Sequence, residues 1–434
     1  MSPEAIGVIG LMALLGLLSA GVPIAAAMGL VGGVGLCILL SPEAALVKAG
    51  VVAFHSVSSY ELGVLPLFVF MAHVCFAAGA TQQFFNAAAK LIGHFPGGLA
   101  LASIAGCAGF GAISGSSLAT TATIGLSALP EMRRQNYSPA LATGTLAAGG
   151  TLGVLIPPSG ALIVFGILAE QSIGKLFTAA VIPGLSQALL YMIAILLLCW
   201  RWPALAPKSP RASWAERKRA VFGLLDVTLL AAVVMTGIFG GFFTPTEAAS
   251  VGAAGALCLC ALRRRLNLTS LLEALRQTLK TTGMIYAVLL GAHLLSLFLG
   301  VSRIPDRVAQ FVVDLDAGPT VATIAMAVTL LVLGSFLDGL ALMLLTTPVF
   351  LPIALRLGLS PIWFGIFLVR AMEIGFVHPP VGMNVYVIHG LAPDIPLRSI
   401  FRGILPFLGM DFLHLGLLIA LPKLALWLPS LLGH

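Results

Sequence analysis

The chain has 434 residues, of which 59% are hydrophobic and only 9% are charged, and its mean hydropathy is +1.06. A water-soluble domain of this length needs far more polar residues to cover its surface, so the composition excludes that class. The net charge of +7 relates to membrane topology in such a chain, and nucleic acid is not an expected partner. The composition predicts an all-α polytopic membrane protein.

Long uncharged runs mark the first candidate spans. Residues 5–42, 177–200 and 227–246 contain no Lys, Arg, Asp or Glu. A helix needs roughly 20 mostly apolar residues to cross the hydrocarbon core, so each run is long enough to span it. The first run lacks a basic leader and continues into further spans, which argues against a cleaved signal peptide.

A small polar cluster interrupts the uncharged segment 97–130. Its centre reads Ser-Gly-Ser-Ser at residues 114–117, which is a poor helix interior. The cluster suits the tip of a re-entrant hairpin built from two half-helices of about 15 residues, each reaching about 22 Å.

The next segment, 139–170, is predicted to be a broken helix. Pro157 and Pro158 remove two backbone donors, so carbonyls of the preceding turn, residues 153–156, lose their helical partners. Free carbonyls within a membrane are tolerated where protein, water or an ion replaces those partners. The pattern predicts an ion site, with a simple proline kink for packing as the alternative.

A polar and basic linker, residues 201–222, leads to a second half with matching features. Segment 319–352 is again a predicted hairpin, and Asp338 is its only charge. A carboxylate at mid-membrane costs at least about 2.5–3.5 kcal/mol, so Asp338 is expected to face a cavity or an ion. Protonation or a helix cap are the alternatives. Segment 361–390 contains the second proline pair, Pro379 and Pro380, and is the second predicted broken helix.

These features define an internal repeat. An offset of 222 residues brings Pro23 onto Pro245 and Pro139 onto Pro361, and other prolines follow the same spacing. With the linker in the cytoplasm, most of the 23 Lys and Arg residues fall on the cytoplasmic side, which favours inverted halves and places both termini outside. The expected fold has repeats 1–200 and 223–434, with about 11 transmembrane helices.

Arg370 and Glu373 lie three residues apart on the second broken helix. This spacing lets them pair on one helix face. The pair indicates either a substrate pocket or a structural salt bridge, and the spacing alone does not separate the two.

Several motifs together resemble one transporter family. They are GAISGSSLAT at 111–120, PEMRRQNYSP at 130–139, GTLGVLIPPSG ending at Gly160, FTPTEAA at 243–249 and PPVGMN at 379–384. Over essentially the whole chain, the sequence resembles the large membrane subunit of tripartite ATP-independent periplasmic (TRAP) transporters, the DctM-type permeases. The resemblance implies a sodium-coupled, elevator-type importer of small organic anions, such as C4-dicarboxylates or sialic and other sugar acids, in the bacterial inner membrane.

The resemblance also implies partners and sites. The expected partners are a small four-helix membrane subunit, a periplasmic substrate-binding protein and lipid, with sodium as coupling ion and no organic cofactor. The family often has threonine where this chain has His378, so a hydroxyl ligand is missing from the second ion site. Carried over by position, the first ion site consists of Ser114, Ser116, Gly153, Ile156 and Pro158, and the repeat adds a second at Asp338, Gly339, Gly375, His378 and Pro380. The substrate is expected near Ser117, Ser159, Gly339 and Asn384, and Arg370 is a further candidate.

Three alternatives remain at this stage. A stand-alone cation/anion symporter of the same broad fold would need no binding protein. An intramembrane enzyme with Ser116 as nucleophile is disfavoured, because its half provides no accompanying histidine or lysine base. A passive channel is disfavoured by the occluding hairpins and the absence of charged rings, and no nucleotide-binding loop supports an ATP-driven pump.

Overall fold

The computed structural model describes residues 1–434 except 266, 315–317 and 433–434. Within these residues all regular structure is helical, in twenty α-helices and two short 3₁₀ turns. Seven helices are long and apolar enough to cross a membrane, or eight if the bent pair Pro139–Leu155 and Gly160–Leu168 counts as one span. The described helices therefore provide fewer full-length spans than the predicted number of about 11.

The first half divides its long apolar run into two helices. Residues 5–42, predicted as one uncharged stretch, form α1 and α2, because the chain turns at Gly21 and Pro23 caps α2. The helices of this half are α1 Pro3–Ser19, α2 Ile24–Leu39, α3 Pro42–Ser58, α4 Val64–Ala77, α5 Ala80–Ile92, α6 Gly98–Ser114, α7 Ser117–Arg134, α8 Pro139–Leu155, α9 Gly160–Leu168 and α10 Ile173–Arg201.

The predicted linker 201–222 is only partly a linker. Its last nine residues belong to α11, because Ser213 and Glu216 form a capping box that starts the helix at Trp214. The second half consists of α11 Trp214–Phe239, α12 Pro245–Leu262, α13 Leu268–Ser302, α14 Ile304–Asp314, α15 Gly318–Gly334, α16 Gly339–Arg356, α17 Pro361–Gly375, α18 Met383–Leu391, α19 Leu397–Ala420 and α20 Lys423–Leu431.

Both predicted hairpins are present as helix pairs, and both extend beyond the predicted limits. Helix α7 continues through Pro130 to Arg134, and α16 continues through Pro352 to Arg356. One of the seven span-length helices is α16 itself, which the sequence places in a re-entrant hairpin. In each half a hairpin, a broken helix and a long helix follow in the same order.

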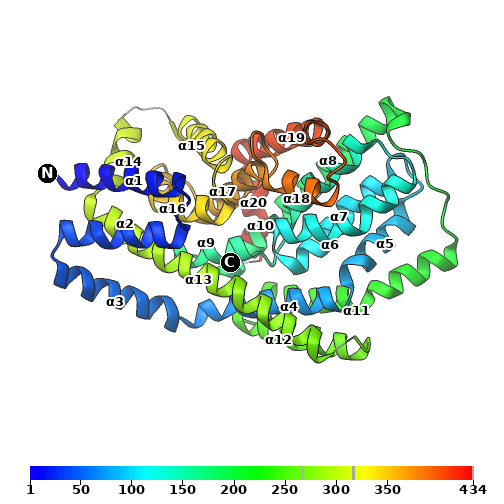
Figure 1. The fold of residues 1–434 in the computed structure, drawn as a ribbon, viewed down its shortest axis with the longest axis horizontal. Coiled ribbons are helices and arrows are strands. Elements are labelled where there is room, and N and C mark those ends of the chain that lie inside the picture. Colours follow the sequence, from blue (N-terminus) through cyan, green and yellow to red (C-terminus); the bar gives the residue numbers. More distant parts are fainter. Residues whose placement is uncertain (266, 315–317, 433–434) are drawn as a thin grey trace.

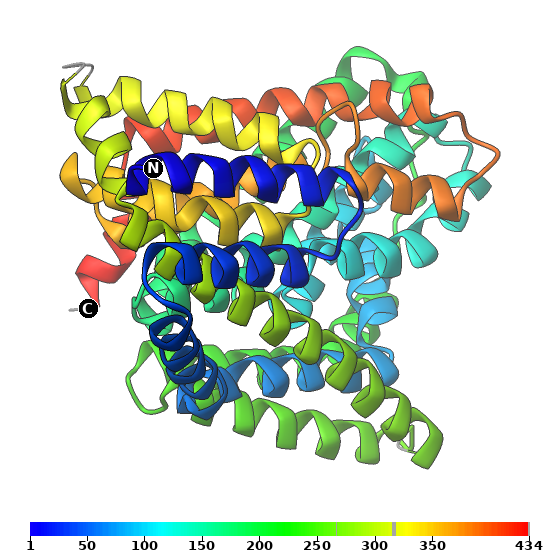
Figure 2. The same ribbon diagram turned by 60° about the vertical axis from the view of Figure 1, so that its left-hand side comes forward.

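The helices form two groups that run side by side. Figures 1 and 2 place α3, α4, α11, α12 and α13 along one side and α8, α15, α18 and α19 along the other. Helices of the two halves pack against each other in and around the second group. Helix α19 packs along α8, and α18 packs on α7. The hairpins and broken helices of both halves therefore share one packed unit.

Candidate functional site

The first hairpin tip touches the first helix break. Gly115 joins α6 to α7 with φ of 60°, a left-handed conformation that favours glycine. A Cβ atom added there would lie 2.9 Å from the carbonyl oxygen of Pro158 and 3.1 Å from the amide nitrogen of Gly160. The tip and the break are thus in contact, and the contact leaves no room for a side chain.

Two serine hydroxyls stabilise this tip. The Oγ atom of Ser116 accepts the N–H of Ala119 at 3.4 Å and so caps α7. The Oγ atoms of Ser114 and Thr120 lie 2.7 Å apart. The backbone of Gly153 approaches the same tip, since a Cβ atom on it would lie 2.7 Å from the carbonyl oxygen of Ser116.

The first break leaves backbone carbonyls without helical donors. The last helical bond of α8 runs from the N–H of Ile156 to the carbonyl of Leu152 at 3.0 Å. Pro157 and Pro158, joined by a cis peptide bond, have no N–H to donate to the carbonyls of the preceding turn. The α8–α9 pair bends by 41° at this point. The first hairpin tip therefore contacts a segment whose backbone carbonyls lack helical donors.

The second tip repeats this arrangement with a carboxylate. Asp338 caps α16, because its Oδ1 atom accepts the N–H groups of Leu340 at 3.0 Å and Ala341 at 3.1 Å. The helix-cap interpretation of Asp338 is therefore confirmed, and its second oxygen takes no part in this cap. A Cβ atom on Gly375 would lie 2.8 Å from the carbonyl oxygen of Gly334, so tip and break meet here too.

The second break leaves fewer backbone groups without a hydrogen-bond partner than the first. The carbonyl of Phe376 accepts the N–H of Asn384 at 3.0 Å, and the N–H of His378 donates to the carbonyl of Ile374 at 2.8 Å. The Nδ1 atom of His378 lies 3.4 Å from the Oγ atom of Ser335. Pro380 follows a cis peptide bond with Pro379. The imidazole of His378 thus points toward the tip.

Both tips open onto one cavity of about 740 Å³. Ser114 of the first tip and Asp338 of the second tip both line the cavity. Helices α2, α4 and α13 supply most of the opposite wall, which is largely apolar. Of the predicted ion-site residues, those that line the cavity are Ser114, Ser116, Pro158, Asp338 and Gly339, whereas Gly153, Ile156, Gly375, His378 and Pro380 do not.

Comparisons with known proteins agree with this architecture. The family described as "Tripartite ATP-independent periplasmic transporter, DctM component" matches residues 11–424. The chain belongs to the DctM family. A similar relative is the C4-dicarboxylate TRAP transporter large permease protein DctM of Pseudomonas aeruginosa, 35% identical over 401 residues, which are 92% of this chain and 93% of the relative.

Other relatives of this DctM chain are named for the transport of different compounds. The sialic acid TRAP transporter large permease protein SiaM of Vibrio cholerae is 32% identical over 424 residues, covering 97% of this chain and 98% of the relative. The ectoine TRAP transporter large permease protein TeaC of Halomonas elongata is 32% identical over 368 residues, covering 85% and 86%. These relatives are transporter permeases, so the enzyme alternative is excluded.

A solved structure supports the fold independently. The YdaH transporter of Alcanivorax borkumensis has a TM-score of 0.64 at 14% identity, with 99% of both chains covered. At this identity the likeness concerns the fold alone.

Three of the predicted substrate residues of the DctM chain lie outside the cavity lining. Ser117 and Gly339 line it, but Ser159 and Asn384 are fully buried elsewhere. The Oγ atom of Ser159 caps α9 by accepting the N–H of Leu162 at 3.3 Å. The side-chain amide of Asn384 donates to the Oγ of Ser117 at 2.8 Å and to the Ala147 carbonyl at 2.9 Å. Asn384 therefore ties α18 to α7 and α8.

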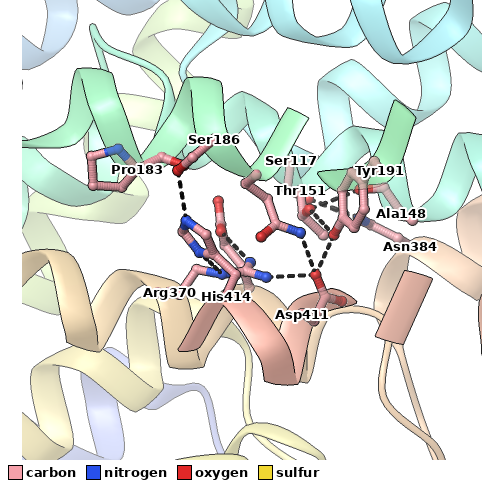
Figure 3. A network of polar contacts seen from close by, with 12 residues as sticks. Ser117, Ala148, Thr151, Pro183, Ser186, Tyr191, Arg370, Asn384, Asp411 and His414 are labelled. Atoms are coloured by element: carbon pink, nitrogen blue, oxygen red, sulfur yellow. Dashed lines mark hydrogen bonds and ion pairs between the residues drawn. The ribbon is translucent and has the colours of Figure 1, made fainter. Parts of the chain in front are cut away.

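Arg370 is the third predicted substrate residue outside the cavity lining. It belongs to a buried polar network (Figure 3). Its guanidinium donates to Glu373 at 2.8 Å, to Asp411 at 2.5 Å and to Nδ1 of His414 at 3.1 Å. The arginine side chain is completely buried, and none of these four residues lines the cavity. The structure thus forms the salt bridge that was one interpretation of the Arg370–Glu373 spacing, and a direct contact of Arg370 with substrate stays a prediction.

Two partners of Arg370, Asp411 and His414, were missed by the sequence analysis. Asp411 also accepts the hydroxyl of Tyr191 at 2.5 Å and the side-chain amide of Gln187 at 2.8 Å. The Nε2 atom of His414 lies 2.9 Å from the Oγ of Ser186. One signal was available, because Asp411 is the only acidic residue in the apolar segment 397–420, and a lone intramembrane carboxylate implies a partner.

Proposed function

We propose that this DctM permease couples the inward movement of sodium to the import of a small organic acid. One observation carries the proposal: two hairpin tips, each in contact with a helix break, open onto a single cavity of about 740 Å³. In secondary transporters, unwound carbonyls coordinate coupling ions and half-helix ends bind substrate. Here each half provides a helix break and a half-helix end, and the two tips that contact the breaks line one cavity.

The first ion site has the more complete set of oxygen ligands. It combines the hydroxyls of Ser114 and Ser116 with the carbonyls of Gly153, Ile156 and Pro158. Carbonyls beside the two prolines lack helical donors, and a cation is a suitable replacement. We assign sodium to this site, because neutral oxygens suit a hard monovalent cation.

The second ion site is more restricted. Asp338 adds a negative charge, and Gly339, Gly375, His378 and Pro380 complete the proposed set. One oxygen of Asp338 is used as the cap of α16. The second oxygen and the carbonyls are the proposed cation ligands, so binding here depends more on charge than at the first site.

The substrate is proposed to lie between the two tips. Helices α7 and α16 begin at Ser117 and Gly339, and both residues line the cavity. The positive ends of the two helix dipoles favour an anion. Relatives named for C4-dicarboxylate and sialic acid transport support a small carboxylic acid as the substrate class.

The wider assembly follows from the family. We propose a small four-helix membrane subunit and a periplasmic substrate-binding protein as partners in the bacterial inner membrane, with residues 202–213 in the cytoplasm and both termini in the periplasm. The packed unit of hairpins and broken helices would move against α3, α4 and α11–α13 as an elevator. Each sodium ion entering at 100 mV supplies about 2.3 kcal/mol before its concentration gradient is counted.

The test is uptake into proteoliposomes that contain this chain and its small subunit. Radiolabelled carboxylates and sugar acids are presented on the binding protein, with and without an inward sodium gradient. Sodium-dependent uptake that requires the binding protein supports the proposal. Uptake without the binding protein favours the stand-alone symporter, and uptake without ion coupling favours a channel.

A further inference from the structure

One face of α11 carries a basic, an aromatic and several aliphatic side chains in a line along the helix. Trp214, Lys218, Phe222, Leu225 and Leu229 follow at intervals of three or four residues, so they share one face. Trp214 and Phe222 each keep 69% of their surface exposed, Leu225 keeps 51% and Leu229 keeps 58%. Lys218 is also exposed. All five side chains are therefore exposed on the surface of the chain.

The start of this face lies in a strongly basic region. Residues 200–222 contain six Lys and Arg residues and a single acid, Glu216, whose carboxylate lies 3.0 Å from the ammonium of Lys90. The region therefore has positive charge without a protein counter-charge. Across the described part of the chain, no ion pair involves any of the six, which are Arg201, Lys208, Arg211, Arg217, Lys218 and Arg219.

Three exposed tryptophans surround the same region. Trp200 is 80% exposed and Trp202 is 51% exposed, and Trp214 is the third. The ammonium of Lys218 lies 5.7 Å from the Trp214 ring centre, and the guanidinium of Arg201 lies 5.2 Å from that of Trp202. Exposed tryptophan rings are typical of the bilayer interface. The rings next to the cationic groups therefore favour an interfacial position for them, near lipid phosphates.

We propose that this face of α11 binds an anionic phospholipid, with its phosphate at Lys218 and one acyl chain along Phe222, Leu225 and Leu229. The dimensions agree. From Lys218 to Leu229 the helix rises about 16 Å, and one leaflet contributes about 15 Å of hydrocarbon. A basic group at the interface followed by one leaflet of apolar surface matches the head and tail of a phospholipid.

Charge decides which lipid the face selects. A zwitterionic lipid gains little from uncompensated Lys and Arg, whereas each basic residue near the surface attracts anionic lipid. The face is thus expected to prefer phosphatidylglycerol to phosphatidylcholine. This proposal does not depend on the identity of the transported substrate.

The first experiment measures lipid retention by native mass spectrometry of the purified full-length chain. Phosphatidylglycerol or phosphatidylcholine is titrated into the parent protein and into the variant Lys218→Gln with Arg219→Gln. Phosphatidylglycerol binding is expected to fall about fivefold for each charge removed. Lys423→Gln, which changes an exposed lysine at the start of α20, is the matched control and is expected to change nothing. Unchanged binding in the double variant, or equal binding of both lipids by the parent, overturns the proposal.

The second experiment identifies the occupant in the membrane. A photo-crosslinking residue replaces Leu225 in cells that make the complete transporter. Val328 on α15, which is 55% exposed, provides a control position on an apolar helix surface. Cross-links from position 225 to phospholipid, with a higher anionic share than at position 328, support the proposal. A cross-link from position 225 to another polypeptide assigns this face to a protein partner and overturns it.

Discussion

The guanidinium of Arg370 and the carboxylate of Asp411 lie 2.5 Å apart, and their side chains are 0% and 1% exposed. The pair joins α17, which leads to the second helix break, to α19. Tyr191 of α10 donates to the same carboxylate, so helices of both halves meet at one charge. Such a network fixes the position of α17 without contacting the cavity.

Arg370→Met is expected to destabilise the protein by about 3–5 kcal/mol, because removing one partner leaves buried carboxylates uncompensated. Thermal unfolding of the purified protein measures the loss. Asp411→Asn is expected to be milder, since Arg370 keeps Glu373 as a partner. Lys90→Gln removes a half-exposed ion pair and serves as the control, with little change expected. A normally stable Arg370→Met protein with a raised KM for substrate would instead place Arg370 in the substrate site.

The helix breaks and hairpin tips could be predicted from sequence because they depend on local backbone chemistry. Adjacent prolines remove donors wherever they occur, and a Ser-Gly-Ser cluster interrupts a helix whatever surrounds it. The structure accordingly breaks its helices at Gly115, at Pro157–Pro158 and at Pro379–Pro380. The limits of the hairpins were less predictable, since Pro130 and Pro352 lie inside helices that continue past them.

Side-chain roles that depend on distant partners could not be predicted. Asn384 was placed near the substrate by the resemblance, and its side-chain amide bonds to Ser117, 267 residues away in sequence. A second acidic partner of Arg370, Asp411, lies 41 residues later, on another helix. Only packing brings these pairs together, and neither periodicity nor spacing contains that information.

Gly115→Ala is expected to abolish uptake, because the added methyl group would lie 2.9 Å from the Pro158 carbonyl oxygen and force the tip away from the break. Gly358→Ala is the matched control. Gly358 has φ of 73° but no atom within 4 Å of an added Cβ, so it suffers only the backbone cost of about 1–2 kcal/mol. Sodium-driven uptake by folded protein distinguishes the two. Equal uptake by both variants would mean that contact between tip and break is not required.

Ser116→Ala is expected to raise the sodium concentration for half-maximal uptake by about tenfold, an effect typical of perturbing a metal site. It also removes an N-cap, at a cost of about 1 kcal/mol. Ser41→Ala removes a comparable cap, the bond from the N–H of Ala44 at 3.2 Å, away from the cavity. If both variants lose stability but only Ser116→Ala shifts the sodium dependence, the hydroxyl of Ser116 contacts the ion. A sodium dependence equal to that of Ser41→Ala would restrict Ser116 to capping.

Asp338→Asn separates the two roles of this residue, because asparagine caps a helix about as well as aspartate but carries no charge. The variant is expected to unfold at nearly the parent temperature, while the sodium concentration for half-maximal uptake rises about 10- to 100-fold. Asp338→Ala loses both the cap and the charge, so it should also be less stable by about 1 kcal/mol. Unfolding curves and sodium titrations of uptake on all three proteins give the comparison. An Asp338→Asn protein with the parent's sodium dependence would leave Asp338 as a helix cap alone and remove the charge from the second ion site.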